Sequence, residues 1–590
     1  MNSTFEHPIY YLKQKQKLDD NIIQDLEMLK LTNDNDNTNN NTNNNDNDNT
    51  NDNDNTNDTR TSLLENIINP KSKIGVENLN KVCEYYTDDK KFIKETQSLI
   101  TKWKYEKSLE NKEYIYDNFY EMWKEIKSDE TFIDRYYYVD VDFFKFLNNS
   151  SPFLQILSLY NLFSPILTLI MPIILLIVPF FMLKYSGIDL TLESYYGVLK
   201  KIFASHALGN ITNIFSDVSI QQKVYALVSL GFYLFSIYQN SLVCYRFYKN
   251  FYTIHNNLFL LRDYLNTSID NMEILQNTCS GYKTYKPFLD NIKPNKELCI
   301  KMRDKLNVII PFDFKNLYNK SNQIGYIMKH FYEFHTSLDL ENTINYTLGL
   351  NSYLDYINEF NKLYREKRIN KCKFGKKTKF EEAYYPYLFN NNPIKNTINI
   401  KKNIAITGPN ASGKTTILKT TLLNIIFSQS IGFGFYSKGT LSPYNKIHCY
   451  LNIPDTSGRD SLFQAEARRC KEIIESLEDN EKHFCIFDEL FSGTNPNEAC
   501  ASSYGFIKYL IKNNNIDFIL TTHLLDLCKK IDNIVDNCNM NVISKDNFNF
   551  NYTYKINYGI SEIKGGLKIL KDLEYPEFVL TESNKILTTL

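Results

Sequence analysis

The stretch NIAITGPNASGKTT at residues 403–416 decides the fold of the last third of the chain. Its first part, NIAIT, predicts a short buried strand that runs straight into the pattern G-x-x-x-x-G-K-[ST]. Gly408 and Gly413 allow the backbone to curl so that its N–H groups point at phosphate oxygens. Lys414 is expected to reach the β- and γ-phosphates, and Thr415 to offer its hydroxyl to Mg²⁺. The stretch therefore predicts a loop that binds the phosphates of a nucleotide.

The residues after this loop predict a helix with one apolar face, made by Ile417, Leu418, Leu422, Ile425 and Ile426. The positive end of such a helix points at the bound phosphates. A strand before the loop and a helix after it are the context that the motif requires. The residues expected to bind the nucleotide are Gly408, Pro409, Asn410, Ala411, Ser412, Gly413, Lys414, Thr415 and Thr416.

A second buried strand is predicted at residues 483–489, HFCIFDE, and it ends in two carboxylates. Successive side chains at a strand end point to opposite sides, so adjacent acids can serve two roles. We expect Asp488 to bind Mg²⁺ together with Thr415. We expect Glu489 to polarise the attacking water as the catalytic carboxylate.

Three further elements accompany the two strands. Ser461 opens a helix with the sequence SLFQAE, and the turn SGTN at residues 492–495 follows the carboxylates. A third strand end, LTTH at residues 520–523, finishes in His523. A histidine at that place can sense or hydrogen-bond the γ-phosphate, and the order and spacing of the motifs favour this role over an ordinary core histidine.

Taken together, these elements resemble the ATPase domain of the MutS mismatch-repair proteins, a branch of the ABC-type ATPases. The family's T-G-P-N-x-x-G-K-[ST]-T loop corresponds to residues 407–416, and its S-T-F-x-x-E segment to Ser461, Leu462, Phe463 and Glu466. Its L-L-D-E-x-x-x-G-T-S corresponds to residues 486–495 and its A-T-H to residues 521–523. The resemblance covers residues 380–580, about a third of the chain, and as an ordered set of four motifs it is specific.

The resemblance implies ATP hydrolysis with Mg²⁺ in a homodimer. In that arrangement Ser461 of one subunit faces the γ-phosphate that the other subunit binds. The sequence Ala383-Tyr384-Tyr385-Pro386 stands where the family has A-R-H-P, which makes Tyr385 the candidate for the adenine side of the site. Binding of double-stranded DNA is also implied by the family.

The chain departs from the mismatch-recognising members of the family. Those members carry a G-x-F-Y-E wedge that stacks on the mispaired base. Here Phe119-Tyr120-Glu121 and Phe331-Tyr332-Glu333 spell the core tripeptide, but both lie in helical patterns and neither follows a glycine at the right offset. Only about 400 residues precede the phosphate loop, fewer than a full set of upstream MutS domains requires.

Composition limits the remaining possibilities. The 67 Lys and Arg residues balance 68 Asp and Glu residues, which excludes a protein that coats nucleic acid through overall positive charge. The eleven cysteines form no C-x-x-C pair, so we expect a reduced, intracellular protein without a cysteine-based zinc site. The N-terminus has no apolar secretory core, hence no signal peptide is expected. A basic run at residues 362–379 is interpreted as a solvated linker or a phosphate contact.

Two long uncharged stretches predict a transmembrane hairpin at residues 153–183 and 224–245. About 20 apolar residues cross a bilayer core, and ILTLIMPIILLIVPFFML at residues 166–183 meets that length. Pro172 and Pro179 would kink a helix there, which membranes tolerate. The alternative is a buried helical pair in a large soluble domain. An even number of crossings would keep the ATPase domain on the cytosolic side.

The expected fold class is α + α/β, with a helical N-terminal region, a transmembrane hairpin and a C-terminal P-loop ABC-type α/β ATPase domain. Two functions stay open: ATP switches a clamp on DNA, or ATP rearranges a membrane-anchored dimer that reads no mismatch. The hairpin resembles an arrangement in MutS-like ATPases with hydrophobic segments upstream. The expected divisions are an N-terminal segment 1–31, a disordered Asn/Asp/Thr linker 32–59, a helical region 60–145, a hydrophobic region 146–246, a helical, lever-like region 247–379 ending in the basic linker, and the ATPase domain 380–590.

Overall fold

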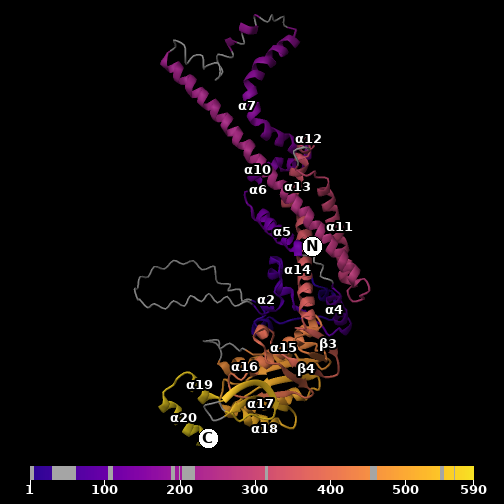
Figure 1. Ribbon diagram of the computed structural model, residues 1–590, viewed down its shortest axis with the longest axis vertical. Coiled ribbons are helices and arrows are strands. Elements are labelled where there is room, and N and C mark those ends of the chain that lie inside the picture. Colours follow the sequence, from indigo (N-terminus) through magenta and orange to yellow (C-terminus); the bar gives the residue numbers. More distant parts are fainter. Residues whose placement is uncertain are drawn as a thin grey trace. The chain divides into compact units, whose positions relative to one another are not determined.

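The protein, seen here as a computed structural model, divides into two compact units (Figure 1). Unit 1 comprises Met1–Ser3, Glu110–Asp270 and Asn295–Tyr346, and unit 2 comprises Thr4–Leu109, Asn271–Pro294 and Thr347–Leu590. The predicted linker at 32–59 lies outside the residues that the structure describes. Those residues are 5–29, 62–103, 110–187, 193, 195–197, 200–201, 219–312, 317–451, 461–544, 550–563 and 565–589.

Unit 1 is helical, in agreement with the helical patterns of the sequence. Three of its helices, α10, α11 and α14, also contribute residues to unit 2. The helices are α5 (Glu110–Ser128), α6 (Phe132–Arg135), η4 (Asp142–Asn149), α7 (Ser151–Tyr185), α10 (Ile220–Cys279), α11 (Lys286–Asn307), α12 (Leu317–Ser321), α13 (Ile324–Thr336) and α14 (Leu338–Arg365).

Helix α7 has polar residues on its inner side and apolar residues on its outer side. Ser158, Asn161 and Ser164 are buried, each three or four residues from the next. The opposite stripe is apolar and exposed, as at Ile156 and Phe163. This order is the reverse of the one that a helix on a water-soluble core shows. The exposed stripe continues through Leu167, Ile170, Ile174, Ile177, Val178, Phe181 and Met182.

Polar contacts join α7 to α10. The amide of Asn240 donates to Thr168 Oγ1 at 2.6 Å, and Cys244 Sγ lies 3.2 Å from the carbonyl of Leu162. Large apolar residues of α10 are exposed, among them Phe232 and Phe235. Within the described residues, these two helices are long and apolar enough to cross a membrane by length and composition.

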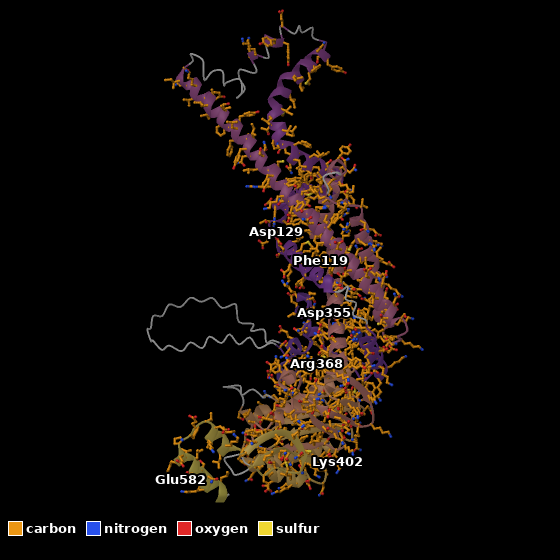
Figure 2. All side chains as sticks on the ribbon, viewed as in Figure 1. Phe119, Asp129, Asp355, Arg368, Lys402 and Glu582 are labelled. Atoms are coloured by element: carbon orange, nitrogen blue, oxygen red, sulfur yellow. The ribbon has the colours of Figure 1, made fainter. Side chains whose placement is uncertain are left out.

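The two Phe-Tyr-Glu tripeptides lie inside helices of unit 1. Phe119 lies in α5 (Figure 2). It is fully buried and stacks on Tyr264 with 3.8 Å between the ring centres. Phe331, in α13, is also fully buried, with its ring 5.3 Å from that of Phe132. Both phenylalanines are therefore part of the helical core and are not presented as a wedge.

Unit 2 is an α/β structure with a six-stranded sheet in the order β13-β12-β6-β11-β10-β9 and a five-stranded sheet in the order β5-β4-β8-β3-β7. Strands β12, β6, β11, β10 and β9 are parallel, whereas β13 is antiparallel to β12. The strands are β3 (Asn370–Phe374), β4 (Thr378–Ala383), β5 (Asn396–Ile400), β6 (Ile404–Thr407), β7 (Phe433–Gly434), β8 (Lys438–Leu441), β9 (Lys446–Tyr450), β10 (His483–Asp488), β11 (Ile516–Thr521), β12 (Asp536–Ser544) and β13 (Phe550–Tyr558).

Helices follow most of these strands, as expected for parallel pairing, which needs crossover connections. Those of the last third are η6 (Pro386–Asn391), α15 (Lys414–Ser430), α16 (Leu462–Glu475), α17 (Pro496–Ile511), α18 (Leu525–Ile531), α19 (Gly566–Asp572) and α20 (Glu577–Thr589). Nearer the N-terminus unit 2 also contains η1 (Pro8–Tyr11), β1 (Gln16–Lys17), α1 (Asp20–Asp25), α2 (Leu63–Ile68), α3 (Lys73–Glu77), η2 (Leu79–Lys81), β2 (Tyr85–Tyr86) and α4 (Lys90–Lys102).

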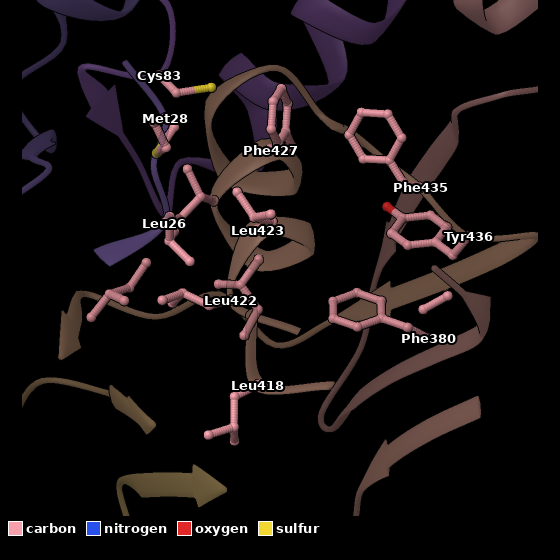
Figure 3. Close-up of a cluster of buried hydrophobic side chains, with 14 of the residues drawn as sticks. Leu26, Met28, Cys83, Phe380, Leu418, Leu422, Leu423, Phe427, Phe435 and Tyr436 are labelled. Carbon is pink, nitrogen blue, oxygen red and sulfur yellow. The ribbon is translucent and has the colours of Figure 1, made fainter. Parts of the chain in front are cut away.

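The N-terminal segment is part of the core of unit 2, which differs from the division expected from the sequence. Leu26 and Met28 are buried in the cluster that contains Leu418 and Leu422 of α15 (Figure 3). Glu27 pairs with Lys419 at 3.0 Å. Residues 62–103 of the predicted helical region 60–145 also belong to unit 2, and its later residues to unit 1. Such pairing of distant segments has no local sequence signal.

The basic run at residues 362–379 also differs from the predicted linker. It contains the end of α14, strand β3 and the start of β4. Cys372 and Thr378 are buried, whereas Lys371 and Lys373 on either side of Cys372 are exposed. The run therefore alternates as a half-buried strand does, with its lysines on the outer face. The second sheet of unit 2 accordingly begins at Asn370, before the predicted boundary at 380.

Candidate nucleotide site

The predicted motifs meet where three neighbouring parallel strands end. In the registers of the sheet, Asp488 at the end of β10 lies opposite Thr521 of β11, and Thr521 lies opposite Ile406 of β6. The carboxyl ends of parallel strands share one edge of a sheet, which is where α/β proteins place their ligands. The loop after β6, the acids after β10 and His523 after β11 are thus brought together.

The loop between β6 and α15 has the conformation that its sequence predicts. Gly413, immediately before α15, has φ +94°, a value that residues with a side chain rarely adopt. Ala411 has φ +59°. Where left-handed and right-handed backbone angles alternate, successive N–H groups point inward. They form a concave surface that binds anions. The first turn of α15 adds the positive end of a 17-residue helix.

A hydroxyl and a carboxylate lie side by side at the start of α15. Thr415 Oγ1 donates to Asp488 Oδ2 at 2.7 Å, and the hydroxyl of Thr521 donates to the other carboxylate oxygen, Oδ1. Oxygen ligands of this kind suit Mg²⁺. Thr521 had no assigned role in the sequence analysis. Its signal is a polar residue that follows the apolar run Phe518–Leu520 at the end of β11, opposite Asp488 of the neighbouring strand.

Lys414, His523 and Glu489 form a second cluster. Lys414 Nζ donates to the carbonyl of Gly408 at 3.1 Å and lies 3.0 Å from His523 Nε2. Glu489 Oε1 lies 3.0 Å from the same Nε2 and 3.8 Å from Lys414 Nζ. A histidine nitrogen accepts when unprotonated and donates when protonated, so Nε2 bonds to one of these partners at a time. His523 can therefore exchange between the lysine and the carboxylate.

The charges of this cluster influence one another. Burial lowers the pKa of Lys414, whereas the charges of Glu489 and Asp488 raise it. The hydrogen bond from His523 lowers the pKa of Glu489, an effect that burial of the carboxyl opposes and that the charges of His523 and Lys414 reinforce. Glu489 is therefore held in its ionised form and offers a charged oxygen to a water molecule or a proton.

The residues at this edge fit a nucleotide with Mg²⁺. Ser412 Oγ is buried without a hydrogen-bond partner among the described residues, so its hydroxyl is free to bond to a ligand. A cleft of about 300 Å³ adjoins the loop, lined by Gly408, Pro409, Asn410, His523, residues 561–563 and residues 565–566. In the described part of the chain, no three His, Cys, Asp or Glu side chains gather to hold a metal ion. A cation here would thus share Thr415 and Asp488 with phosphate oxygens.

Two predicted site residues lie apart from these clusters. Ser461 is exposed at the start of α16, where it caps the helix: its hydroxyl accepts from Gln464 N at 3.3 Å, and Gln464 Oε1 accepts from Ser461 N at 3.0 Å. Tyr385 is half-buried against the hydrophobic core, and burial raises its pKa to about 12. Among the described residues that line the cleft beside the loop, Tyr385 is absent. Its adenine role stays a prediction.

Comparison with known proteins agrees with the motifs. Residues 404–590 match the family model described as MutS domain V. The chain is 26% identical over 202 residues to DNA mismatch repair protein spellchecker 1 of Drosophila melanogaster, covering 33% of this chain and 22% of that protein. It is 31% identical over 151 residues to endonuclease MutS2 of Staphylococcus aureus, covering 25% and 21% of the two chains. It is 28% identical over 247 residues to endonuclease MutS2 of Thermus thermophilus, covering 41% and 32%.

The chain thus spans between about a fifth and a third of the length of these curated relatives. The likeness supports the predicted resemblance to the MutS family, and the family model covers the last third of the chain, which contains the phosphate loop and the three strand ends.

Proposed function

We propose that this chain is a MutS-like ATPase that binds and hydrolyses ATP with Mg²⁺. The proposal rests on one observation: three parallel strand ends bring the phosphate loop, the Thr415–Asp488 pair and the Lys414–His523–Glu489 cluster to one edge. The match to MutS domain V over the same residues supports it.

Each group has a distinct task in this proposal. The N–H groups of residues 408–413, Lys414 and Thr416 hold the phosphates, and Thr415 with Asp488 holds Mg²⁺. Bound Mg²⁺ supplies positive charge against the β- and γ-oxygens. Glu489 orients and polarises the attacking water, and His523 hydrogen-bonds the γ-phosphate. The exchange of His523 between Lys414 and Glu489 lets that histidine respond to the phosphate.

Two substitutions test the assignment because they separate binding from turnover. Lys414→Ala should abolish nucleotide binding, measured with a fluorescent ATP analogue. Glu489→Gln should keep binding and lower kcat by about 10²–10⁴-fold, the usual effect of removing a positioned general base. Lys419→Ala and Glu475→Gln, on α15 and α16, are matched controls whose rates should stay near wild type. Equal rates in Glu489→Gln and wild type would contradict the proposal.

We further propose a homodimer with composite sites, in which Ser461 faces the γ-phosphate bound by the partner subunit. The exposed position of Ser461, away from the Lys414 cluster, is compatible with this role. Mixing Lys414→Ala chains with Ser461→Arg chains leaves one intact site in each mixed dimer. For random pairing, about a quarter of wild-type activity should return. A monomer under ATP in light scattering, with no recovery on mixing, would contradict the dimer.

Double-stranded DNA is the first candidate for the binding partner on which ATP hydrolysis acts. The relatives whose names include DNA mismatch repair and endonuclease support it. So do the exposed lysines of β3 and the turn after it, including Lys373, Lys376 and Lys377. The burial of Phe119 and Phe331 argues against a wedge made by either tripeptide. Fluorescence anisotropy on matched and mispaired duplexes, repeated over a salt series, tests this proposal, since phosphate contacts weaken steeply with salt.

A membrane-anchored ATPase without mismatch recognition is the second candidate. The specific observation behind it is the reversed polarity of α7 and the apolar exposed residues of α10. In this proposal the spans 153–183 and 224–245 cross a lipid bilayer, and the ATPase domain of an intracellular protein faces the cytosol. Alkaline carbonate extraction tests the anchor, and protease access to residues 380–590 in sealed vesicles tests the orientation. Complete release into the carbonate supernatant would contradict this candidate.

A further inference from the structure

Glu466 ties α16 to the loop that follows Glu489. Its side chain lies inside α16, five residues after Ser461, and is 2% exposed. Oε1 accepts from the backbone N–H of Ser492 at 3.0 Å and from the Ser492 hydroxyl at 2.8 Å. Oε2 accepts from the N–H of Gly493 at 3.2 Å. A buried carboxylate with three donors makes strong, directional bonds, so this link is stiff.

The same loop, residues 489–495, also packs on the first turn of α16. A side-chain carbon at Gly493 would lie 2.7 Å from the backbone nitrogen of Phe463, which leaves room only for glycine. The rings of Phe463 and Phe491 lie 5.6 Å apart. The loop thus contacts the helix within two residues of Ser461, in addition to the bonds at Glu466.

The first residues of the loop have backbone angles that are energetically unfavourable for residues with side chains. Glu489 has φ +53° and Phe491 has φ +57°, left-handed values that are costly for residues with side chains. The surroundings maintain them: Glu489 N donates to the carbonyl of Thr521 at 3.1 Å, and Phe491 N to Tyr450 Oη at 3.4 Å. The direction of the Glu489 carboxylate therefore depends on how the loop is held.

We propose that Glu466 is a positioning residue that couples Ser461 to Glu489. Ser461 and Glu466 belong to one helix, so a displacement of Ser461 moves the carboxylate that holds Ser492 and Gly493, and with it the loop that orients Glu489. This inference rests on the proposed function, in which Ser461 faces the nucleotide of the partner subunit. The contact between the two subunits then adjusts the catalytic carboxylate of this chain. Each subunit thereby senses whether its partner holds ATP.

Glu466→Gln tests this coupling, because glutamine keeps the size but replaces one acceptor with an N–H₂ group that faces a donor. We expect kcat for ATP to fall about tenfold, the effect of losing one charge-assisted hydrogen bond. The Kd for ATP should stay within about twofold, because Lys414 and the loop at 408–413 are unchanged. Glu472→Gln, on the exposed side of α16, is the matched control and should keep the wild-type kcat.

A double-substitution cycle separates coupling from a merely structural role. If Glu466 acts through Ser461, then Glu466→Gln should lower kcat by less than about twofold in a Ser461→Ala background. Effects that multiply, or a Glu466→Gln kcat within about twofold of wild type, would overturn the inference.

Circular dichroism checks that Glu466→Gln folds. If it does not fold, Ser492→Ala, which removes one donor from the loop side, replaces it. For Ser492→Ala a smaller kcat loss of about threefold with unchanged Kd is expected, and a wild-type kcat would overturn the inference. A wild-type chain without ATPase activity would instead refute the proposed function itself.

Discussion

The sheet of unit 2 and the α7–α10 pair of unit 1 are both built from strongly apolar sequence, yet they arrange it in opposite ways. In β10 and β11 the apolar side chains are fully buried, and Asp488 and Thr521 stand where the two strands end. In α7 Ser158, Asn161 and Ser164 are buried, whereas many large apolar side chains of the same helix are exposed. Composition alone does not separate these two cases. The side on which the polar residues lie indicates which surroundings each region is built for.

This contrast also relates to the two candidate functions. The strand ends of unit 2 place charged groups where a nucleotide fits, and both candidate functions use that site. The described side chains of the exposed stripe of α7 form no such site, and the stripe suits a partner that covers apolar surface without specific bonds. Acyl chains of lipids are such a partner.

The largest effect is expected from charges placed on the exposed apolar stripe. Leu167→Arg with Ile170→Arg, at residues 42% and 41% exposed, should block membrane insertion. Each arginine near the middle of a membrane helix costs about 2.5–3.5 kcal/mol. The pair therefore opposes insertion by about 6 kcal/mol. Membrane flotation of the full chain measures the result.

A control pair of arginine substitutions in unit 2 shows whether the effect is specific to α7. Leu388→Arg with Ile394→Arg changes residues of similar exposure, 39% and 44%, which we expect to face water. These two arginines should leave flotation and ATP hydrolysis unchanged. If both double variants behave alike, the difference between the regions is not one of solvent and the hairpin is a soluble element.

A smaller effect, of different size in the two regions, is expected for truncation to alanine. Leu422, fully buried in the cluster of Figure 3, should cost about 2–5 kcal/mol of unfolding free energy when replaced by alanine, because a cavity is left. Leu167→Ala should cost less than about 1 kcal/mol, since an exposed side chain leaves no cavity. Denaturant unfolding of the full chain in detergent, followed by tryptophan fluorescence and by loss of ATP binding, compares the two. A larger loss for Leu167→Ala would show that α7 is a buried core helix.

The smallest expected effect is a change in the free energy of unfolding at acidic pH. Burial, together with the neighbouring His483, lowers the pKa of His448 to about 3, and the pKa of His483 is lowered as well. In the unfolded chain a histidine binds a proton near pH 6.5, whereas the folded His448 stays neutral to a lower pH. Protons therefore favour the unfolded state as the pH falls from 6.5 toward 3, and the free energy of unfolding decreases over that range. Above pH 6.5 this loss is absent. At pH 5.5 the wild type should lose about 1.4 kcal/mol more than His448→Gln.

Thermal unfolding at pH 7 and pH 5.5 measures this difference for unit 2, with loss of ATP binding as the signal. Lys446, Arg469 and Glu478 also face this pair of strands, so their charges must be kept in both variants. An identical pH dependence in wild type and His448→Gln would show that His448 is protonated in the folded chain.

The strands and the helix around the candidate site could be predicted from the sequence. The phosphate loop needs its glycines and lysine at fixed spacing, and the strand that ends in Asp488-Glu489 is a continuous apolar run, so both are readable without neighbours. The same holds for His523 at the end of β11. Their meeting at one edge follows from the parallel pairing of β10, β11 and β6.

Contacts between distant segments could not be predicted in this way. The sequence around Leu26 and Met28 does not indicate which helix they pack against, because hydrophobic contacts are not directional. The charges of the basic run at 362–379 predict a solvated linker or a phosphate contact, and they do not reveal that Cys372 and Thr378 face inward. Glu466 was noted only as a motif residue. Its three donors come from a loop 26 and 27 residues away, whose fold the sequence does not reveal.

The place of the N-terminal segment in unit 2 has a consequence for how the protein is made. Asp25 bonds to Cys449, and Glu27 to Lys419, over separations of 424 and 392 residues. At the usual rate of synthesis, the ribosome needs on the order of a minute to add that length. Leu18, Ile22, Leu26 and Met28 therefore wait that long before the residues that bury them emerge. This segment leaves the ribosome before the residues that bury it and packs only after they have emerged, so during that interval these four apolar side chains can be bound by chaperones.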